Sequence, residues 1–422
     1  MSRVTHFSWY LIFPMQKKEV DAVFSIIIIA MLFFGLVMIS SVSVYSSYTI
    51  TLKQVLKGVL DEPNNSYFMV RTIMYVVMGI VVMTIFSKIP YDFFEKYAKQ
   101  FFWGSVIFLA AVFIPWVGAE YHGATGWIDL PWLPSIQPVE FAKLSLIIML
   151  AFFLKRRKAM MKDVSMGVIP YFLHAGVVVI LLMLQPDFGS ILILSPIVLA
   201  MYFVGNGNVR FVAIAILVVI VGAVGVYGLG KAFGEQTKLW YISKRVDNFL
   251  RSNKDIAQTK NSGNNDDQLR NGFIAIGSGG FWGLGFGASI QKFGYLPEVY
   301  GDFIFSVIVE ELGFVRGTIL IWFYLFIAYR WYNIARSVKD LFWKYVAFGI
   351  TTWFVVQAFI NIGVNLNVIP LTGVTLPFVS YWGSSILSLC MAAGIVLSIS
   401  RHREVRPQNL SEALQAGRKV VL

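Results

Sequence analysis

The sequence predicts an all-α, polytopic membrane protein with about ten transmembrane helices. Three observations support this prediction. Hydrophobic residues make up 57% of the 422-residue chain, and its mean hydropathy is +0.69. Charged residues make up only 14%, against roughly 25% in soluble domains. Apolar runs recur along the chain, and their lengths approach the ~20 residues that a membrane-spanning helix needs. These runs override the two or three soluble domains that length alone would suggest.

The apolar runs also place the individual spans, because polar or helix-breaking residues separate them. The ten expected spans cover residues 22–46, 67–87, 101–118, 138–154, 165–185, 188–205, 210–232, 303–329, 342–368 and 378–400.

Lys and Arg gather in short segments on one side of the expected membrane, which places both ends of the chain in the cytoplasm. Residues 1–21 then form a cytoplasmic segment, 22–400 a membrane domain and 401–422 a cytoplasmic tail. The short outer loops at 119–137 and 369–377 contain no Lys or Arg. This bias accounts for the net charge of +12 without nucleic acid, which we exclude as a partner.

The loop from 233 to 301, between spans seven and eight, lies outside the membrane and has two distinct parts. Residues 251–268 are polar and are expected to be flexible. Residues 271–298 are apolar, aromatic and Gly-rich, so we expect them to lie at the membrane interface or to dip into the protein. Their glycines follow no expected strand and complete no GxGxxG, so no organic cofactor is predicted. The single cysteine, Cys390, allows no disulfide within one chain.

Ionisable residues at membrane depth usually face a cavity or a partner, so each is a candidate functional residue. Glu140 and Lys143 lie three residues apart on one helix face and predict an ion pair. The alternative is that the pair only neutralises two buried charges. Asp187, after the helix-breaking Pro186, is by itself better explained as a helix cap.

Four carboxylates lie at or within the start of the eighth span. Glu298 and Asp302 come just before it, and Asp302 is also explained as an N-cap. Glu310 and Glu311 lie two to three turns deeper, where Arg316 offers them a structural partner.

A fourth polar segment surrounds the start of the last span. Asn361, Asn365 and Asn367 end the ninth span, and Ser384 and Ser385 begin the tenth. Irregular backbone at this depth is tolerated where it is buried in protein or lines a cavity. Because all four segments fall at the outer ends of spans, we predict one shared, outward-facing cavity.

These segments resemble the SEDS family of bacterial membrane proteins (shape, elongation, division and sporulation). The residues that carry the resemblance are "GWIDLPWLPSIQPVEFAKL", "LLMLQPDFGS", "AIGSGGFWGLGFGASIQKFGYLPEVYGDFIFSVIVEELGF" and "NIGVNLNVIPLTGVTLPFVSYWGSS", in the family's order. "SIQKFGYLPE", "QPDF", "NIGVNL" and "TLPFVSY" favour its FtsW-like division branch over its RodA-like elongation branch, with a sporulation paralogue left open.

The resemblance implies a ten-helix fold and a peptidoglycan glycosyltransferase that polymerises lipid II during septal wall synthesis in the cytoplasmic (inner) membrane. It implies that Asp302 is catalytic and that Glu140 and Lys143 line its cavity. The implied partners are a class B penicillin-binding protein, division regulators and membrane lipids. The full set of candidate substrate-binding residues is Trp127, Gln137, Glu140, Lys143, Asp187, Gln291, Lys292, Glu298, Ser384 and Ser385.

The sequence departs from the family pattern at four positions beside these candidates. The usual His-Thr before the catalytic aspartate is Tyr300-Gly301, and the usual basic residue before Trp127 is Gly126. The usual Tyr-Gly-Gly-Ser-Ser is Tyr381-Trp382-Gly383-Ser384-Ser385, so Trp382 replaces a glycine. The loss of a cation at Gly126 is expected to weaken phosphate binding.

In the mechanism we expect, Asp302 accepts the proton of the acceptor hydroxyl, or binds a divalent cation, Mg or Mn, that activates it. Lys143, helped by Lys292, faces the diphosphate, and the Gly-rich loop covers a lipid tail held between spans. Two alternatives remain open, a flippase for lipid-linked precursors and a non-catalytic division scaffold. An ion-coupled transporter is disfavoured, because no inverted repeat with paired broken helices is seen.

Overall fold

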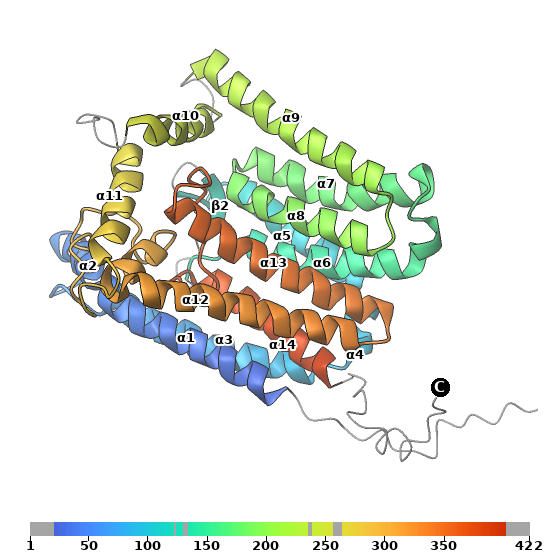
Figure 1. Ribbon diagram of the computed structural model, residues 1–422, viewed down its shortest axis with the longest axis horizontal. Helices are drawn as coiled ribbons and strands as arrows, with labels where there is room; N and C mark the ends of the chain where they lie inside the picture. The colour runs from blue at the N-terminus through green and yellow to red at the C-terminus, as the bar shows by residue number, and fades with distance from the viewer. Residues whose placement is uncertain (1–20, 122–123, 130–133, 235–238, 256–263, 402–422) are drawn as a thin grey trace, which may run out of the picture.

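The computed structural model describes residues 21–121, 124–129, 134–234, 239–255 and 264–401, which fold into a helical bundle (Figure 1). A helix occupies all or part of each of the ten predicted spans. They are α1 (Ala22–Val42), α3 (Tyr67–Lys88), α5 (Ala98–Ala110), α6 (Pro138–Arg157), α7 (Ile169–Leu184), α8 (Phe188–Val204), α9 (Val209–Phe233), α12 (Ile304–Ser337), α13 (Leu341–Asn365) and α14 (Gly383–Ser400).

Six of these helices are long and apolar enough by themselves to cross a membrane, namely α1, α7 with its preceding π-turn (Val164–Val168), and α3, α9, α13 and α14. Helices α5 and α8 are apolar but shorter, and α6 and α12 carry several charged residues. The chain is therefore a multi-pass membrane protein. The count of ten crossings and the cytoplasmic placement of both ends stay predictions.

Helix α13 lies at the centre of the bundle and packs against α6, α8, α12 and α14, while α3 packs on α14. Most side chains of α13 are buried, as expected for a helix that is apolar on all sides. Helix α9 is the opposite case, because its apolar window has no buried residue and it runs along the edge of the bundle (Figure 1). The core therefore surrounds α13, and α9 leaves room beside α7 and α8.

Shorter elements gather at one end of the bundle, the predicted outer end. They are α2 (Val44–Leu56), the hairpin of β1 (Gly118–Tyr121) and β2 (Ala124–Ile128), α10 (Trp240–Asp255) and α11 (Asn264–Gly279) (Figure 1). Helix α4 (Tyr91–Lys96) and two 3-10 turns, Ala111–Phe113 and Lys158–Met160, complete the described elements.

The all-α fold class is confirmed, with one local addition, because residues expected in an outer loop pair as β1 and β2. One expectation about the outer segments was wrong. The polar stretch expected to be flexible is helical up to residue 255 and from residue 264, while 256–263 lie outside the described residues. The cytoplasmic segments at 1–20 and 402–422 also lie outside them.

The backbone of the Gly-rich loop packs against a kink in α12, while most of its large side chains, such as Phe281 and Trp282, stay exposed as expected at a membrane interface. Gly313 has φ +85° and interrupts that helix. The freed carbonyls of Glu310 and Glu311 accept hydrogen bonds from the backbone N–H groups of Leu284 (2.9 Å) and Gly285 (3.0 Å). A Cβ atom on Gly283 would lie 2.2 Å from the Glu311 carbonyl, so this close approach requires glycine.

Candidate functional site

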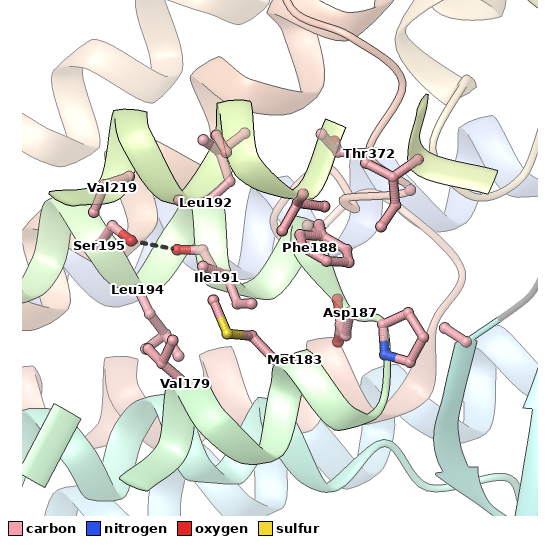
Figure 2. A pocket seen from close by; sticks show the side chains of 18 of the residues that line it. Val179, Met183, Asp187, Phe188, Ile191, Leu192, Leu194, Ser195, Val219 and Thr372 are labelled. Atoms are coloured by element: carbon pink, nitrogen blue, oxygen red, sulfur yellow. Dashed lines mark hydrogen bonds between the residues drawn. The ribbon is translucent and has the colours of Figure 1, made fainter. Parts of the chain in front are cut away.

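A cavity of about 1080 Å³ lies among α7, α8, α9 and the outer loops. One part of it is apolar and the other polar. Figure 2 shows the apolar part, where Val179 and Met183 of α7, Leu192 of α8 and Val219 of α9 surround the space. In the same view, Asp187 lies at the side of the cavity opposite Val179 and Val219.

The polar part brings together five of the predicted residues. Trp127, Gln137, Asp187, Glu298 and Asp302 all line the cavity, although they come from four separate segments of the chain. The side chain of Asp187 also caps α8, because its carboxylate accepts from the Ser190 N–H at 3.0 Å and the Ser190 hydroxyl at 2.7 Å. The shared cavity inferred from the sequence therefore exists, with one of its carboxylates also serving as a cap.

Two asparagines of α13 hold the backbone of Asp302 in place. The Nδ2 atoms of Asn361 and Asn365 each donate to the Asp302 carbonyl oxygen at 2.8 Å. Asn365 Oδ1 also accepts from the N–H of Ser306 (3.0 Å) and from its hydroxyl (2.7 Å). The asparagine-rich end of α13 therefore fixes the segment that presents Asp302 to the cavity.

The turn before Asp302 is equally well defined. Glu298 has φ +53°, and its carbonyl accepts from the N–H groups of Gly301 (2.9 Å) and Phe303 (3.4 Å). Between them, Tyr300 stacks on Phe68 with ring centroids 4.3 Å apart. Burial raises the pKa of the Tyr300 phenol, and the nearby Glu298 carboxylate raises it further, so this phenol stays protonated.

Glu140 and Lys143 form the predicted ion pair, with Lys143 Nζ 2.6 Å from Glu140 Oε1. Their expected place on the cavity wall was wrong, because both are buried inside the bundle and the described cavity lining does not include them. Ser388 donates to the other Glu140 oxygen at 3.0 Å, and Lys143 Nζ donates to Gln357 Oε1 at 3.2 Å. The pair therefore lies behind the cavity rather than facing a substrate.

A chain of hydrogen bonds links this pair to the cavity. Gln357 Nε2 donates to the hydroxyl of Thr375 at 3.0 Å, and Thr375 lines the cavity. Ser385 lies 3.0 Å from the same hydroxyl, and Ser384 accepts from the backbone N–H of Gln137 at 3.0 Å. Both predicted serines therefore support lining residues and are absent from the described cavity lining themselves.

Gln291 and Lys292 belong to a different cluster, so the expectation that Lys292 faces a diphosphate was wrong. Lys292 Nζ is 2.9 Å from Glu311 Oε1 and also donates to the Ser41 hydroxyl (3.0 Å) and the Gly287 carbonyl (2.8 Å). Its side chain is only 3% exposed. It anchors the Gly-rich loop to α1 and α12.

Glu310 and Glu311 serve the same anchor. Glu310 accepts from the N–H groups of Ile290 (3.0 Å) and Gln291 (3.4 Å), and from the Ser289 hydroxyl (2.5 Å). Arg316, expected as their partner, instead donates to the carbonyls of Trp282 (2.8 Å) and Leu312 (3.1 Å). These deep carboxylates therefore hold the loop.

Sequence reasoning missed Arg245, the one Lys or Arg side chain among the described residues that line the cavity. It lies on α10, where its guanidinium also donates to the Leu371 carbonyl at 3.3 Å. The polar, strongly amphipathic character of residues 240–255 could have indicated that this segment is a helix with one face against the protein.

Two of the departures from the family pattern, Gly126 and Trp382, line the cavity. The rings of Trp127 and Trp382 lie 4.6 Å apart with an interplanar angle of 41°, and both line the cavity. A Cβ atom on Gly126 would have the Gln185 amide oxygen 3.9 Å away, with no closer described neighbour. The space that a basic side chain at position 126 would occupy is therefore open. The space at position 382, in contrast, is filled by the Trp382 ring.

A divalent cation would have two carboxylates of this chain to bind. Among the described residues, no group of three or more His, Cys, Asp and Glu is placed to hold a metal. Mg²⁺, however, commonly binds through one or two carboxylates together with substrate phosphates and water. Glu298 and Asp302 on the same cavity fit that pattern.

Fold and site together define a multi-pass membrane protein whose outer cavity joins an apolar groove to a carboxylate-bearing polar end. Residues 21–405 match the family described as "Cell cycle protein", which is named for FtsW, RodA and SpoVE. The chain belongs to this family, the SEDS family that its motifs resemble, and is FtsW-like within it.

Curated relatives cover nearly the whole chain. It is 33% identical over 387 residues to the "Probable peptidoglycan glycosyltransferase FtsW" of Francisella salina, which covers 91% of this chain and 89% of that protein. It is 32% identical over 389 residues to the "Stage V sporulation protein E" of Bacillus subtilis strain 168, covering 92% and 98%.

Solved structures share the fold. A chain described under "Structural coordination of polymerization and crosslinking by a peptidoglycan synthase complex" is 25% identical with a TM-score of 0.69, covering 91% of this chain and 98% of that one. The rod shape determining protein RodA of Thermus thermophilus is 24% identical with a TM-score of 0.63, covering 92% and 98%, and supports the fold alone.

Proposed function

We propose that this protein is a peptidoglycan glycosyltransferase that polymerises lipid II into glycan strands at the division septum. The observation that supports this most directly is the position of Asp302 at the polar end of a cavity whose other end is apolar. Family membership and the names of the FtsW relatives support the same reaction.

The chemistry follows from what polymerisation requires. The oxygen of an acceptor sugar hydroxyl forms a new bond to C1 of the donor sugar, while the bond from C1 to the diphosphate oxygen breaks. The hydroxyl proton passes to Asp302, and the lipid diphosphate leaves with the bonding electron pair. A positioned carboxylate base contributes about 10²–10⁴-fold to such a step.

The leaving diphosphate needs positive charge beside it, and Arg245 is the residue placed to supply it. Guanidinium groups bind phosphate oxygens in a bidentate manner. Lys143 and Lys292, which the sequence suggested for this role, are buried in ion pairs with Glu140 and Glu311 and do not belong to the described cavity lining. In the alternative in which Glu298 and Asp302 hold a divalent cation, that cation would activate the acceptor hydroxyl.

The apolar part of the cavity suits the lipid. Side chains of α7, α8 and α9 line it, including Val179, Leu192 and Val219, and the apolar window of α9, which has no buried residue, borders it. A hydrocarbon tail there would replace contact with the bilayer by contact with these side chains. One substrate would then place its sugars at the carboxylates and its tail between the helices.

We also propose a class B penicillin-binding protein as the partner, together with division regulators. The similarity to a chain from a complex described as coordinating polymerization and crosslinking supports a crosslinking partner. The FtsW relatives favour a septal site of action over an elongation role.

The test is glycan-chain assembly from purified lipid II, with and without the partner, in Mg²⁺, in Mn²⁺ and after chelation. We expect Asp302→Asn to lower the rate at least 100-fold. Asp92→Asn, an exposed carboxylate on α4 at the other end of the bundle, is the matched control. Full polymerisation by Asp302→Asn would refute the assignment.

A lipid-translocation assay in vesicles separates the two alternatives. A flippase would move lipid II without joining sugars and would tolerate Asp302→Asn. A scaffold would do neither, but would still bind the transpeptidase and increase crosslinking by it.

A further inference from the structure

The polar end of the cavity carries an aromatic wall that the mechanism above does not use. Trp127 lies on β2 and Trp382 just before α14, and their rings contact each other beside the cavity. Tyr121 of β1, also a lining residue, packs edge-on against Trp127 with centroids 5.8 Å apart. Three aromatic rings from separate segments therefore form one continuous surface.

This wall is not part of the buried core. Trp127 and Trp382 are each only partly buried, although residues such as Trp331 and Trp353 are fully enclosed in the same bundle. Two large apolar rings exposed to water in a cavity are unfavourable, and a ligand that covered them would remove this apolar surface from water.

The wall also lies beside the carboxylates. A Cβ atom on Gly301 would lie 2.9 Å from Nε1 of Trp382 and 3.3 Å from Oε2 of Glu298. Gly301 directly precedes Asp302 in the chain. A ring that rests on Trp382 would therefore lie beside Glu298 and next to the turn that carries Asp302.

We propose that Tyr121, Trp127 and Trp382 form a sugar-stacking subsite that holds a pyranose ring of the acceptor strand with a hydroxyl towards Asp302. This inference rests on the proposed function and names the part of the substrate that this wall binds. The chemistry is specific, because a pyranose has an apolar face of C–H groups that packs on an aromatic face, while its hydroxyls bind carboxylates and amides at the edge. Glu298 and Gln137 supply such groups on the same cavity.

The positions of Arg245 and Asp302 indicate that the aromatic wall binds the acceptor sugar rather than the donor sugar. The donor sugar is attached to the diphosphate and must lie where Arg245 meets it, whereas the acceptor hydroxyl must lie against the base. Trp382 is placed beside the carboxylate turn, at 298–302.

The experiment measures polymerisation kinetics and, separately, binding of a water-soluble β-1,4-linked N-acetylglucosamine tetramer by saturation-transfer NMR. Trp382→Leu and Trp127→Leu are each expected to raise KM for lipid II about tenfold with little change in kcat, and to abolish tetramer binding. Trp382→Phe and Trp127→Phe keep an aromatic face and should stay within about threefold of the wild type. Trp322→Leu, on the exposed face of α12, is the matched control for loss of a tryptophan.

The outcomes separate this inference from the proposed function. Leucine variants that keep the wild-type KM and still bind the tetramer would overturn the subsite while leaving the glycosyltransferase intact. Phenylalanine variants as poor as the leucine variants would also overturn it, because the aromatic face would then not be the feature that binds. If the wild type binds the tetramer through these tryptophans but does not polymerise lipid II, the subsite stands and the proposed reaction fails.

Discussion

The indole of Trp382 occupies the space that a side chain at Gly301 would need. A Cβ atom on Gly301 would lie 2.9 Å from Nε1 of Trp382, closer than real Cβ atoms come to their neighbours. In the family pattern these positions carry a larger residue at 301 and no tryptophan at 382. The two departures therefore compensate one another, and each explains why the other is tolerated.

This relationship predicts a coupled pair. Gly301→Ala should lower the free energy of unfolding by about 1–3 kcal/mol, because overpacking forces neighbours out of position. In a Trp382→Ala background the same change should cost less than about 0.5 kcal/mol. Thermal unfolding in detergent of the wild type, both single variants and the double variant measures the coupling. Equal costs in the two backgrounds would mean that Trp382 does not fill this space.

The clamp on Asp302 gives a second prediction. Asn365→Ala removes one of the two Nδ2 donors to the Asp302 carbonyl and the Oδ1 acceptor for Ser306, so the base is held less firmly, by Asn361 alone of the two asparagines. We expect kcat for lipid II polymerisation to fall by about 100-fold with KM nearly unchanged, because small displacements of a reacting group are costly.

Thr352→Ala is the control for this clamp. It lies on the same helix, where its hydroxyl donates to the Phe348 carbonyl one turn earlier (2.9 Å). A variant at Asn365 with normal kcat would show that Asp302 is positioned without Asn365.

The sequence predicts the helices and the shared cavity well, because both depend on the distribution of apolar and polar residues. The carboxylates are harder to place. Asp302 and Glu310 are two turns apart and chemically alike, yet Asp302 lines the cavity and Glu310 anchors a loop. The difference arises from the kink at Gly313 and from loop backbone brought there by tertiary packing, which local pattern does not encode.

The cations show the same limit. Lys143 and Lys292 looked suited to bind a phosphate because each lies near a candidate segment. The structure instead pairs each lysine with a buried carboxylate. The pair of Lys292 and Glu311 could not be seen in the sequence, because the two residues are far apart along the chain. Arg245 lies in a segment without a recognised motif and reaches the cavity only because α10 folds over it.

The buried pair behind the cavity predicts a stability effect. Lys143→Met should destabilise the protein by about 3–5 kcal/mol, because Glu140 would remain buried without its partner. Glu140→Gln/Lys143→Met should recover much of this loss. Lys155→Met is the comparison, since its pairs with Glu95 and Asp340 at the other end are partly exposed, and about 1 kcal/mol or less is expected. If the double variant is as unstable as the single one, the loss does not come from an unpaired charge.

The loop anchor predicts a local effect. Lys292→Met removes the partner of Glu311 and the bridge to Ser41, so the Gly-rich loop should open more often. Amide hydrogen exchange of Leu284 and Gly285, whose N–H groups donate to α12, should accelerate at least tenfold. Unchanged exchange there would show that Glu310 and the backbone bonds hold the loop without Lys292.

Arg245 provides the sharpest test of the electrostatics of the cavity. Arg245→Gln removes the basic side chain that lines the described cavity, so we expect KM for lipid II to rise about tenfold and the salt dependence of KM to weaken. Lys244→Gln removes the same charge from the adjacent residue, whose ammonium lies over Trp240 on the exposed side of α10. Equal effects of the two substitutions would attribute the change to net charge near the membrane. A tenfold effect confined to Arg245 would place the diphosphate against its guanidinium.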